Sequence, residues 1–373
     1  MYRVIELGHI VAGPTAGLIL SQMNFEVIKV EKPGSGDIAR KLTGESAGSF
    51  AYFNRNKKSV EINTKLPVGK EALVRLIKSA DIIIDNFSAD YMVKLGLPYE
   101  ELKKINPKII YVTIRGYSSP SGQGRRSLDY PIEIDSGIAY MNGLSGRPMR
   151  VGASLVDMFS ASMAVIGIYD ALLKREKTGE GGIIDCSLFG SAMFMIGQHI
   201  STYQINEKEL LPINEAGFAW GIYDFFKSED GKNVFIAVTT DDQWKKFCRA
   251  FNFDEEIWGK YSSNEIRFKN RHVLLPIISV EVEKYSFDVL KQILEKNQIV
   301  YSLLRRPWEL LQDSESRNEM NDVNYGGKKM KLPKAPMSQK REEEVPKIGD
   351  SNKEILTSLN FEESEIARIT SPE

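Results

Sequence analysis

The chain contains 373 residues, and at roughly 100–200 residues per domain this length predicts two or three domains and excludes a small disulfide-stabilised protein. With 42% hydrophobic and 27% charged residues, the composition is typical of a globular protein, and we expect no uncharged apolar stretch long enough to span a bilayer. The 49 basic residues nearly balance the 50 acidic ones, so no net field favours nucleic acid or an anionic membrane, and any anion site is local.

The first third of the chain predicts strands that alternate with helices. Short β-branched and apolar runs predict strands at residues 3–7, 26–31, 59–62, 81–84 and 109–114. Helical spacing of apolar residues predicts helices between them, at 16–23, 68–79 and 99–105. This alternation is typical of a parallel sheet covered on both faces, so we predict an α/β fold.

The middle and the end of the chain have a different texture. Residues 156–175 and 186–200 carry few charges and predict two core helices. Residues 203–301 read as α plus β, with two alternating runs joined by the turn Asp230-Gly231, and we predict a smaller second domain there. Residues 322–341 are rich in Gly, Lys and Pro and predict an extended connection, followed by short amphipathic helices at 352–359 and 362–369.

Cysteine usage and the N-terminus bear on the compartment. Cys186 and Cys248, with three histidines, show neither metal-ligand spacing nor a disulfide framework, which indicates a reducing compartment. The first apolar run is interrupted by charge and has no signal-peptide core or cleavage site. We therefore expect a cytoplasmic protein.

A glycine-rich loop at 8–17 joins the first predicted strand to the first predicted helix. Free backbone N–H groups and the helix dipole can hold a phosphate at such a junction. The loop does not match the dinucleotide motif G-x-G-x-x-G, because Gly8 and Gly13 are too far apart and Pro14 removes a donor. A tight turn packed on the sheet explains the glycines equally well.

Basic residues recur after the predicted strands, namely Lys32, Lys65, Lys94, Arg125 and Arg126. In open parallel sheets, ligands bind outside the carboxyl ends of the strands, so these cations could converge on an anionic ligand. Taken singly, each is more typical of a solvated surface charge.

Asp157 is the most informative acidic residue, because it lies among small and apolar residues at the start of the long apolar segment. One interpretation is a carboxylate that favours the helix dipole. The other is a nucleophilic carboxylate in a poorly solvated cleft, able to form covalent intermediates. No alternative nucleophile stands out: His9 and His199 read as satisfied buried histidines, and Cys186 as a core residue.

These pieces resemble a known family, through motifs spread over nearly the whole chain. The sequence resembles the family III CoA-transferases, which include formyl-CoA transferase and, as a divergent branch, α-methylacyl-CoA racemase. The residues that carry the resemblance are Ala12-Gly13-Pro14, VIKVEKPGSGD at 27–37, NRNKKSV at 54–60, Asn86-Phe87, Asn106-Pro107, Gly116-Tyr117, Asp157 and REKTGEG at 175–181. In this order and spacing the motifs are specific.

The resemblance implies a Rossmann-like large domain with a parallel sheet, built from both ends of the chain, and a smaller α+β domain. We place the large domain at residues 1–200 and 325–373 and the small domain, with its linkers, at 201–324. It also implies an interlocked homodimer, with no nucleic acid or membrane partner.

The resemblance further implies roles for single residues. Asp157 takes the place of the catalytic aspartate. Basic contacts to the ADP part of CoA are implied for Lys32, Lys65, Lys94 and Arg126, and contacts to the pantetheine arm or thiol end for Val11, Asn86 and Phe87. Acyl-CoA and a carboxylic acid are then substrates, and no permanently bound cofactor is implied.

The implied reaction is transfer of CoA between carboxylic acids through covalent intermediates on Asp157. Backbone N–H groups of a glycine loop would be needed to stabilise each oxyanion, although the sequence does not identify them. The donor and acceptor acids are not readable from sequence, because pocket shape sets them.

Two departures narrow the function. The racemase branch uses a His where this chain has Leu128, and a Glu where it reads Thr239-Thr240-Asp241-Asp242, so a racemase-like isomerase is disfavoured. Val11 replaces the Gln of formyl-CoA transferase, and no glycine-rich lid is evident between Asn214 and Trp220, so formyl or oxalyl substrates are disfavoured. A catalytically silent CoA-binding subunit is a second rival, and the intact Asp157 counts against it.

Overall fold

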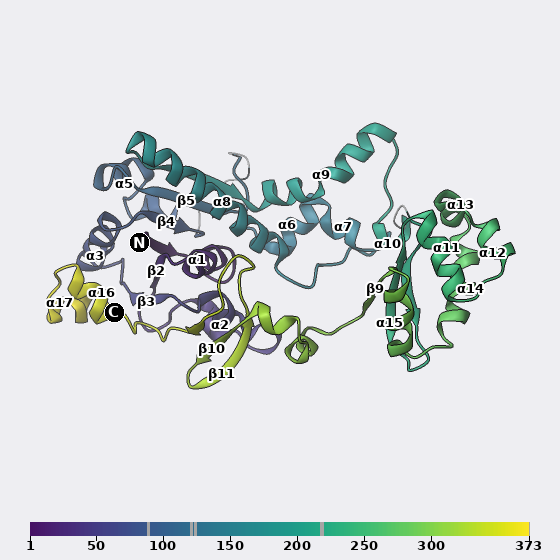
Figure 1. Cartoon of the computed structure of the whole chain (residues 1–373). Helices are drawn as coiled ribbons and strands as arrows, with labels where there is room; N and C mark the ends of the chain where they lie inside the picture. Colours follow the sequence, from purple (N-terminus) through teal and green to yellow (C-terminus); the bar gives the residue numbers. More distant parts are fainter. Residues whose placement is uncertain (88–89, 120–121, 123–124, 217–219, 373) are drawn as a thin grey trace. The chain divides into compact units, whose positions relative to one another are not determined.

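The computed structural model describes residues 1–87, 90–119, 122, 125–216 and 220–372, and the chain forms two compact units (Figure 1). The large unit contains Met1–Leu210 and Ser314–Glu373, and the small unit contains Leu211–Asp313. The domain ends predicted at 200 and 325 fall inside helix α9 (Leu188–Asn206) and strand β10 (Met320–Tyr325). Both elements belong to the large unit.

The large unit is built on a six-stranded parallel sheet. Its spatial order is β3-β2-β1-β4-β5-β6, with every neighbouring pair parallel. The strands are β1 (Arg3–Leu7), β2 (Glu26–Glu31), β3 (Lys58–Glu61), β4 (Ile82–Asp85), β5 (Ile110–Arg115) and β6 (Gly182–Ser187). The chain order reverses between β1 and β4, and in open α/β sheets the crevice outside the carboxyl ends of the strands at such a switch point is where ligands bind.

Both faces of the central strands of this sheet are buried, as the predicted alternation of strands and helices requires. In β4, Ile83 joins the core on one face, and Ile82 and Ile84 join the core on the other, because successive strand residues point to opposite faces. The first face is covered by α3 (Pro67–Lys78), α5 (Tyr99–Ile105) and the C-terminal α16 (Asn352–Ser358) and α17 (Glu363–Ile369). The second is covered by α1 (Ala12–Gln22), α8 (Leu155–Thr178) and α9.

The large unit also contains the short α-helices α2 (Ser49–Asn54), α4 (Tyr91–Lys94), α6 (Asp129–Ser136) and α7 (Ile138–Asn142). The helix predicted from residue 186 begins at Leu188, because Cys186 belongs to β6, where it pairs with Ile114 of β5.

By length and composition, helix α8 is long and apolar enough to cross a membrane. Asp157 and Asp170 interrupt its apolar residues, so it does not contain an uncharged apolar stretch of that length. In the fold, α8 packs against α1, α9, β5 and β6, and its buried face is made of small and branched residues such as Ala161, Ala164 and Ile168. These contacts make it a core helix of the large unit.

The prediction of an extended connection at 322–341 was wrong, because the segment contributes strands to a small sheet. Strands β10 and β11 (Lys328–Pro333) form an antiparallel hairpin, and β12 (Glu342–Glu344) pairs in parallel with β10. The hairpin turns at Gly326 and Gly327, whose φ values of 58° and 87° favour glycine. Since most β11 side chains are exposed, the segment lacks the apolar alternation that would have indicated a strand.

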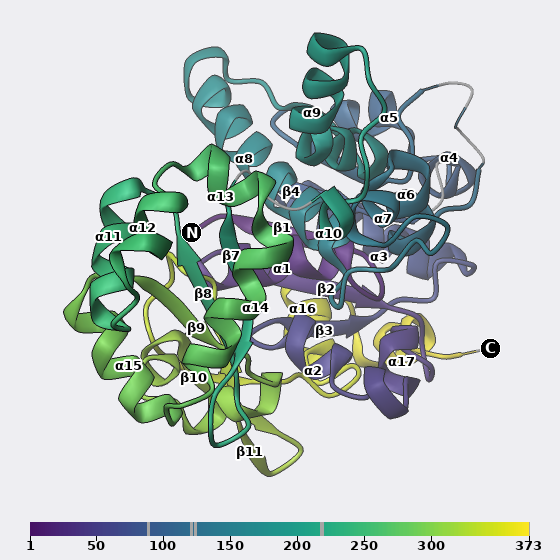
Figure 2. The same cartoon turned by 90° about the vertical axis from the view of Figure 1, so that its right-hand side faces the viewer.

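The small unit has its own sheet and core (Figure 2). Strands β7 (Ile222–Lys227), β8 (Asn233–Val238) and β9 (Val300–Leu303) are antiparallel in the order β7-β8-β9, and the predicted Asp230-Gly231 hairpin is confirmed. Its helices are α10 (Ile213–Ala216), α11 (Asp241–Ala250), α12 (Glu255–Lys260), α13 (Asn264–Lys269), α14 (Arg271–Val282) and α15 (Phe287–Lys296). Trp244, Phe247 and Phe251 are fully buried among them.

Candidate active site

A cavity of about 540 Å³ lies in the large unit, lined by residues that follow four strands of the parallel sheet. The cavity is bordered by the β1–α1 loop, the ends of β4 and β5, the segment leading into α6, the first turn of α8 and the first residue of α9. Its lining includes His9, Ile10, Val11, Ala12, Asn86, Phe87, Arg115, Tyr117, Arg126, Leu128, Asp157 and Leu188. The site therefore lies at the carboxyl edge of the sheet, next to the β1/β4 switch point.

The cavity brings together five of the eight residues to which the family resemblance gives a role, namely Val11, Asn86, Phe87, Arg126 and Asp157. The other three, Lys32, Lys65 and Lys94, are exposed and do not line it. Lys32 follows β2 directly and Lys65 follows β3, so both lie toward the same carboxyl edge of the sheet. Lys94 ends α4 and forms an ion pair with Asp90.

Asp157 lies in the first turn of α8, and a second carboxylate fixes that turn. Ser154, at the N-cap position, makes no side-chain capping bond. Instead, Oδ1 of Asp129 accepts hydrogen bonds from the backbone N–H groups of Val156 (2.9 Å) and Asp157 (3.0 Å). Asp129 thus satisfies N–H groups that the helix leaves unpaired, and it anchors the turn that carries Asp157.

The surroundings of Asp157 and Glu133 raise the pKa values of these two acids. Burial raises the pKa of Asp157 to about 7, the Asp129 charge adds to that shift, and Arg150 opposes it. Burial also raises the pKa of Glu133 to about 7, against the hydrogen bond that its carboxylate accepts from the Val151 N–H (3.0 Å). Such a carboxylate loses little solvation when an apolar substrate group covers it, which suits a nucleophile.

His9 departs from its prediction as a satisfied buried histidine. Its ring stacks on Phe87 with 5.1 Å between centroids and lines the cavity, and its Nδ1 is buried without a hydrogen-bond partner in the described part of the chain. Burial lowers the pKa of His9, so the imidazole is neutral near pH 7. In the sequence, the sign that His9 could belong to a site was its place in the loop that follows β1.

The peptide groups around His9 are held by Asn86. Oδ1 of Asn86 accepts from the His9 backbone N–H (2.9 Å), and its Nδ2 donates to the His9 carbonyl (3.1 Å). A side chain added at Gly13 would meet Asn86 at 3.1 Å, and one at Gly17 would meet Glu6 at 2.0 Å. The glycines of the first loop are therefore explained by close packing on the sheet, which was one of the two interpretations of the sequence.

Arg115 is a cavity residue that the sequence did not single out. It ends β5, and its guanidinium lies 3.3 Å from both the buried Asp85 carboxylate and the Tyr111 hydroxyl. Burial raises the pKa of Asp85, while Tyr111 donates a hydrogen bond to it (2.6 Å). Only the three-dimensional proximity of β4 and β5 reveals this group.

Comparison with known proteins accords with this geometry. The family model described as CoA-transferase family III matches residues 2–350. A succinyl-CoA:glutarate CoA-transferase of Mus musculus is 29% identical, over 98% of this chain and 88% of that protein. A succinyl-CoA:mesaconate CoA-transferase of Haloarcula marismortui is 31% identical, over 79% of this chain and 77% of that protein.

Among solved structures, the crystal structure of a CAIB/BAIF family protein from Brucella suis is similar to this one. It superposes with a TM-score of 0.81 at 26% sequence identity, and the match covers 96% of this chain and 98% of that one. The likeness therefore includes both compact units and the sheet edge that holds the cavity.

Proposed function

The chain belongs to CoA-transferase family III, a family of acyl-CoA:carboxylate CoA-transferases, and on that premise we propose that it transfers CoA through covalent intermediates on Asp157. The observation that carries the proposal is the place of Asp157. It is held by Asp129 in a cavity at the carboxyl edge of the sheet, where burial raises its pKa to about 7.

The proposed reaction balances without an external co-reactant. The ionised Asp157 carboxylate attacks the thioester carbonyl, the C–S bond breaks, and a mixed anhydride and CoA thiolate form. The thiolate then attacks the Asp157 carbonyl, which releases the donor acid and leaves an aspartyl-CoA thioester. The acceptor carboxylate attacks that thioester, and the same two steps run in reverse to give the new acyl-CoA.

One cation of the cavity, Arg126, and three that follow strands of the parallel sheet support a site for the phosphates of CoA. We propose that Arg126, Lys32, Lys65 and Lys94 contact the ADP part, and that Val11, Asn86 and Phe87 contact the pantetheine arm. In the part of the chain that the structure describes, Lys32, Lys65 and Arg126 have no carboxylate within ion-pair distance, so they are available to phosphate oxygens. Lys94 would exchange its partner Asp90 for phosphate.

A racemase-like reaction fits these residues less well. Leu128 lines the cavity where the family resemblance puts the racemase His, and an alkyl side chain cannot move a proton. In the small unit, the Asp241 carboxylate accepts from the buried Arg267 (2.6 Å) in the first turn of α11. That ion pair engages Asp241 in the packing of its own unit.

The names of the relatives support dicarboxylic acids as substrates, since two of them are succinyl-CoA:glutarate and succinyl-CoA:mesaconate CoA-transferases. We propose a dicarboxylic monothioester as donor and a dicarboxylic acid as acceptor, and an interlocked homodimer in the cytoplasm. The exposed apolar side chains of α8 and α9 support a second copy as their cover: Ile166, Leu173, Phe194, Tyr203 and Ile205.

The test supplies the purified chain with succinyl-CoA and, separately, glutarate, mesaconate, oxalate and acetate, and it measures each new acyl-CoA by mass spectrometry. The proposal predicts product with at least one dicarboxylate and none with Asp157→Asn. A parallel sample in D₂O without acceptor acid measures exchange at the α-carbon of a 2-methylacyl-CoA. Exchange there, without transfer in the first assay, would replace the transferase by an isomerase.

A further inference from the structure

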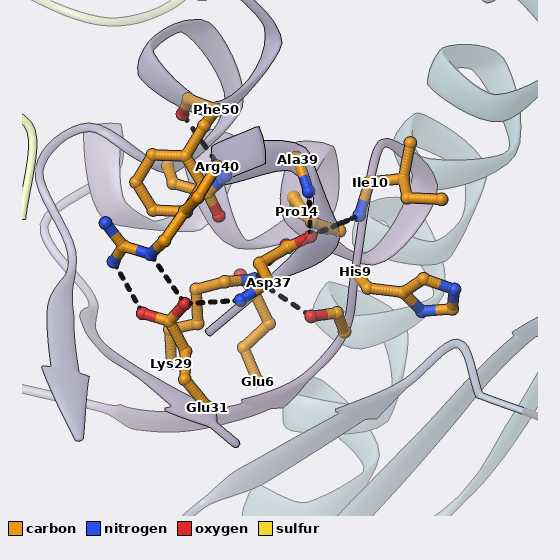
Figure 3. Close-up of polar contacts among 12 residues, drawn as sticks. Glu6, His9, Ile10, Pro14, Lys29, Glu31, Asp37, Ala39, Arg40 and Phe50 are labelled. Atoms are coloured by element: carbon orange, nitrogen blue, oxygen red, sulfur yellow. Dashed lines mark hydrogen bonds and ion pairs between the residues drawn. The ribbon is translucent and has the colours of Figure 1, made fainter. Parts of the chain in front are cut away.

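A buried cluster of four charged side chains lies next to the cavity loop that joins β1 to α1, and Figure 3 labels three of them, Glu6, Lys29 and Asp37. The cluster consists of Glu6, Lys29, Asp37 and Lys57, and none of the four side chains is exposed. Lys29 lies 2.8 Å from both Glu6 and Asp37, and Lys57 lies 2.6 Å from Glu6. Two acids and two bases leave the cluster neutral, as charges removed from water require.

The same cluster contacts the backbone of the cavity loop. Lys29 Nζ donates to the Gly8 carbonyl (2.8 Å), and the Asp37 carboxylate accepts from the Ile10 N–H at 3.2 and 3.3 Å. Asn86 holds the two polar groups of His9 between them. Four consecutive polar groups of the loop, from the Gly8 carbonyl to the Ile10 N–H, are therefore fixed by the side chains of Lys29, Asn86 and Asp37.

Ile10 shows what this fixation achieves. Its φ is 64°, in the left-handed region that β-branched residues avoid. The residues on both sides of it, His9 and Val11, line the cavity together with Ile10 itself. A relaxed Ile10 with negative φ would redirect the chain at that point and change this wall of the cavity.

We infer that Asp37 is a positioning residue of the transferase site, because its buried carboxylate, paired with Lys29, holds Ile10 in the left-handed conformation that shapes the cavity wall. This role rests on the proposed function and adds to it a residue that touches no reacting atom. Asp37 suits the task, since its carboxylate also accepts from the Ala39 N–H (2.9 Å), which fixes its own position.

A double-mutant cycle separates this role from a general effect on stability. Glycine adopts positive φ almost without cost. In the Ile10→Gly variant, residue 10 therefore keeps the left-handed conformation without help from Asp37. In the Ile10 background, Asp37→Asn is expected to lower kcat at least about tenfold with a smaller change in KM. In the Ile10→Gly background, the same change is expected to lower kcat by less than about threefold.

Glu343→Gln is the matched control. Glu343 is also a buried acid of the large unit, paired with the fully buried Arg55 (2.6 Å), and its other side-chain partner is Gln22 rather than the cavity loop. It is expected to lower the melting temperature as Asp37→Asn does while keeping kcat within about threefold of wild type. Equal loss of kcat in both variants at matched melting temperatures would overturn the positioning role, and so would equal effects of Asp37→Asn in the two backgrounds.

A readout without activity distinguishes failure of this inference from failure of the proposed function. If the wild-type chain transfers no CoA, the proposed function is wrong, and exchange of the His9 amide hydrogen then tests the positioning role. Asp37→Asn is expected to raise that exchange rate at least about tenfold although the Asn86 partner remains, and Glu343→Gln is expected to leave it unchanged. An unchanged rate in Asp37→Asn would overturn the inference.

Discussion

Oδ1 of Asp129 accepts a hydrogen bond from the backbone N–H of Asp157 at 3.0 Å, so one carboxylate caps the helix whose first turn carries the other. The arrangement has two opposed effects. The hydrogen bond anchors the turn on which Asp157 stands, while the negative charge of Asp129 adds to burial in raising the pKa of Asp157 to about 7. The position of Asp157 is therefore fixed, while the ionised form of its carboxylate is stabilised only weakly. Both properties suit a nucleophile.

Replacement of Asp129 should separate these two effects. Asp129→Asn keeps an oxygen that can accept from the helix and removes the charge, so the midpoint of the pH profile of kcat/KM should fall. Asp129→Ala removes the cap as well, and it should lower the stability by about 1 kcal/mol and reduce kcat further. Asp170→Asn is the control, because Asp170 lies on the same helix in an exposed pair with Lys174. A profile that Asp129→Asn leaves in place would contradict the electrostatic part of this account.

The wild-type enzyme should gain activity as the pH rises through about 7. Asp157 attacks as the carboxylate, and burial raises its pKa to about 7, so the reactive fraction grows from about pH 6 to about pH 8. The measurement is kcat/KM against pH at saturating acceptor acid, since this quantity reports ionisations of the free enzyme. A profile flat from about pH 5 to about pH 8 would mean that Asp157 is already ionised at the lower limit.

Asp157→Asn should stabilise the protein while abolishing turnover. The folded pKa of Asp157 lies above its unfolded value, so its contribution to stability is fully present below about pH 4 and is lost as the pH rises to about 7. A neutral Asn does not incur that loss. The melting temperature of the variant should therefore exceed that of wild type by about 2 °C or more at about pH 8, and the gap should narrow at about pH 5.

The loss of turnover in Asp157→Asn is checked against its binding of CoA. CoA affinity of Asp157→Asn, measured by calorimetry, should stay within about threefold of wild type, because the residue acts on the carbonyl and not on the phosphates. A variant that melts lower than wild type at about pH 8 would show that the ionised carboxylate is stabilised in the fold.

Removal of a single cation of the proposed CoA site should weaken CoA binding and leave the chemical step unchanged. Arg126→Gln, Lys32→Gln and Lys65→Gln should each raise KM for acyl-CoA about tenfold with kcat nearly unchanged, since a charge-assisted hydrogen bond to phosphate contributes equally before and during reaction. Lys104→Gln is the control, because Lys104 is exposed on α5 and paired with Glu101. Steady-state kinetics with varied acyl-CoA make the measurement. A fall in kcat without a change in KM would remove that residue from the CoA site.

The sequence predicted strands β1 to β5 of the parallel sheet, because these strands are short apolar runs. The predicted strands did not include β6, where half-buried and exposed residues are mixed. The run Ile82-Ile83-Ile84 is buried on both faces, which gives a continuous apolar stretch bounded by turns. The sequence did not predict the β10–β11 hairpin. Its second strand carries three lysines and a proline, all of them exposed, so burial imposes no alternation of apolar and polar residues there. Pairing with β12 and the buried Arg55–Glu343 ion pair stabilise it from distant parts of the chain.

Prediction of the candidate site was limited in the same way. Asp157 stands out locally, since an acid among small apolar residues at a helix start is unusual. The roles of Asp129 and Arg115 depend on distances between separate elements, which no local pattern contains. The same holds for Nδ1 of His9, which has no hydrogen-bond partner among the described residues. Among the basic residues, sequence order showed that several follow strands, but only the fold shows that Arg126 lines the cavity and that Lys94 already has a partner.

The most direct test of the covalent route is mass spectrometry of the protein after incubation with acyl-CoA donors and a hydroxylamine quench. Hydroxylamine converts an aspartyl thioester or anhydride into a stable hydroxamate, and trypsin releases residues 151–174 with Asp157 inside. This account predicts a donor-dependent hydroxamate on Asp157, most abundant with succinyl-CoA and absent from Asp157→Asn. A chain that turns over acyl-CoA and acceptor acid in the same sample yet shows no modified Asp157 would contradict it.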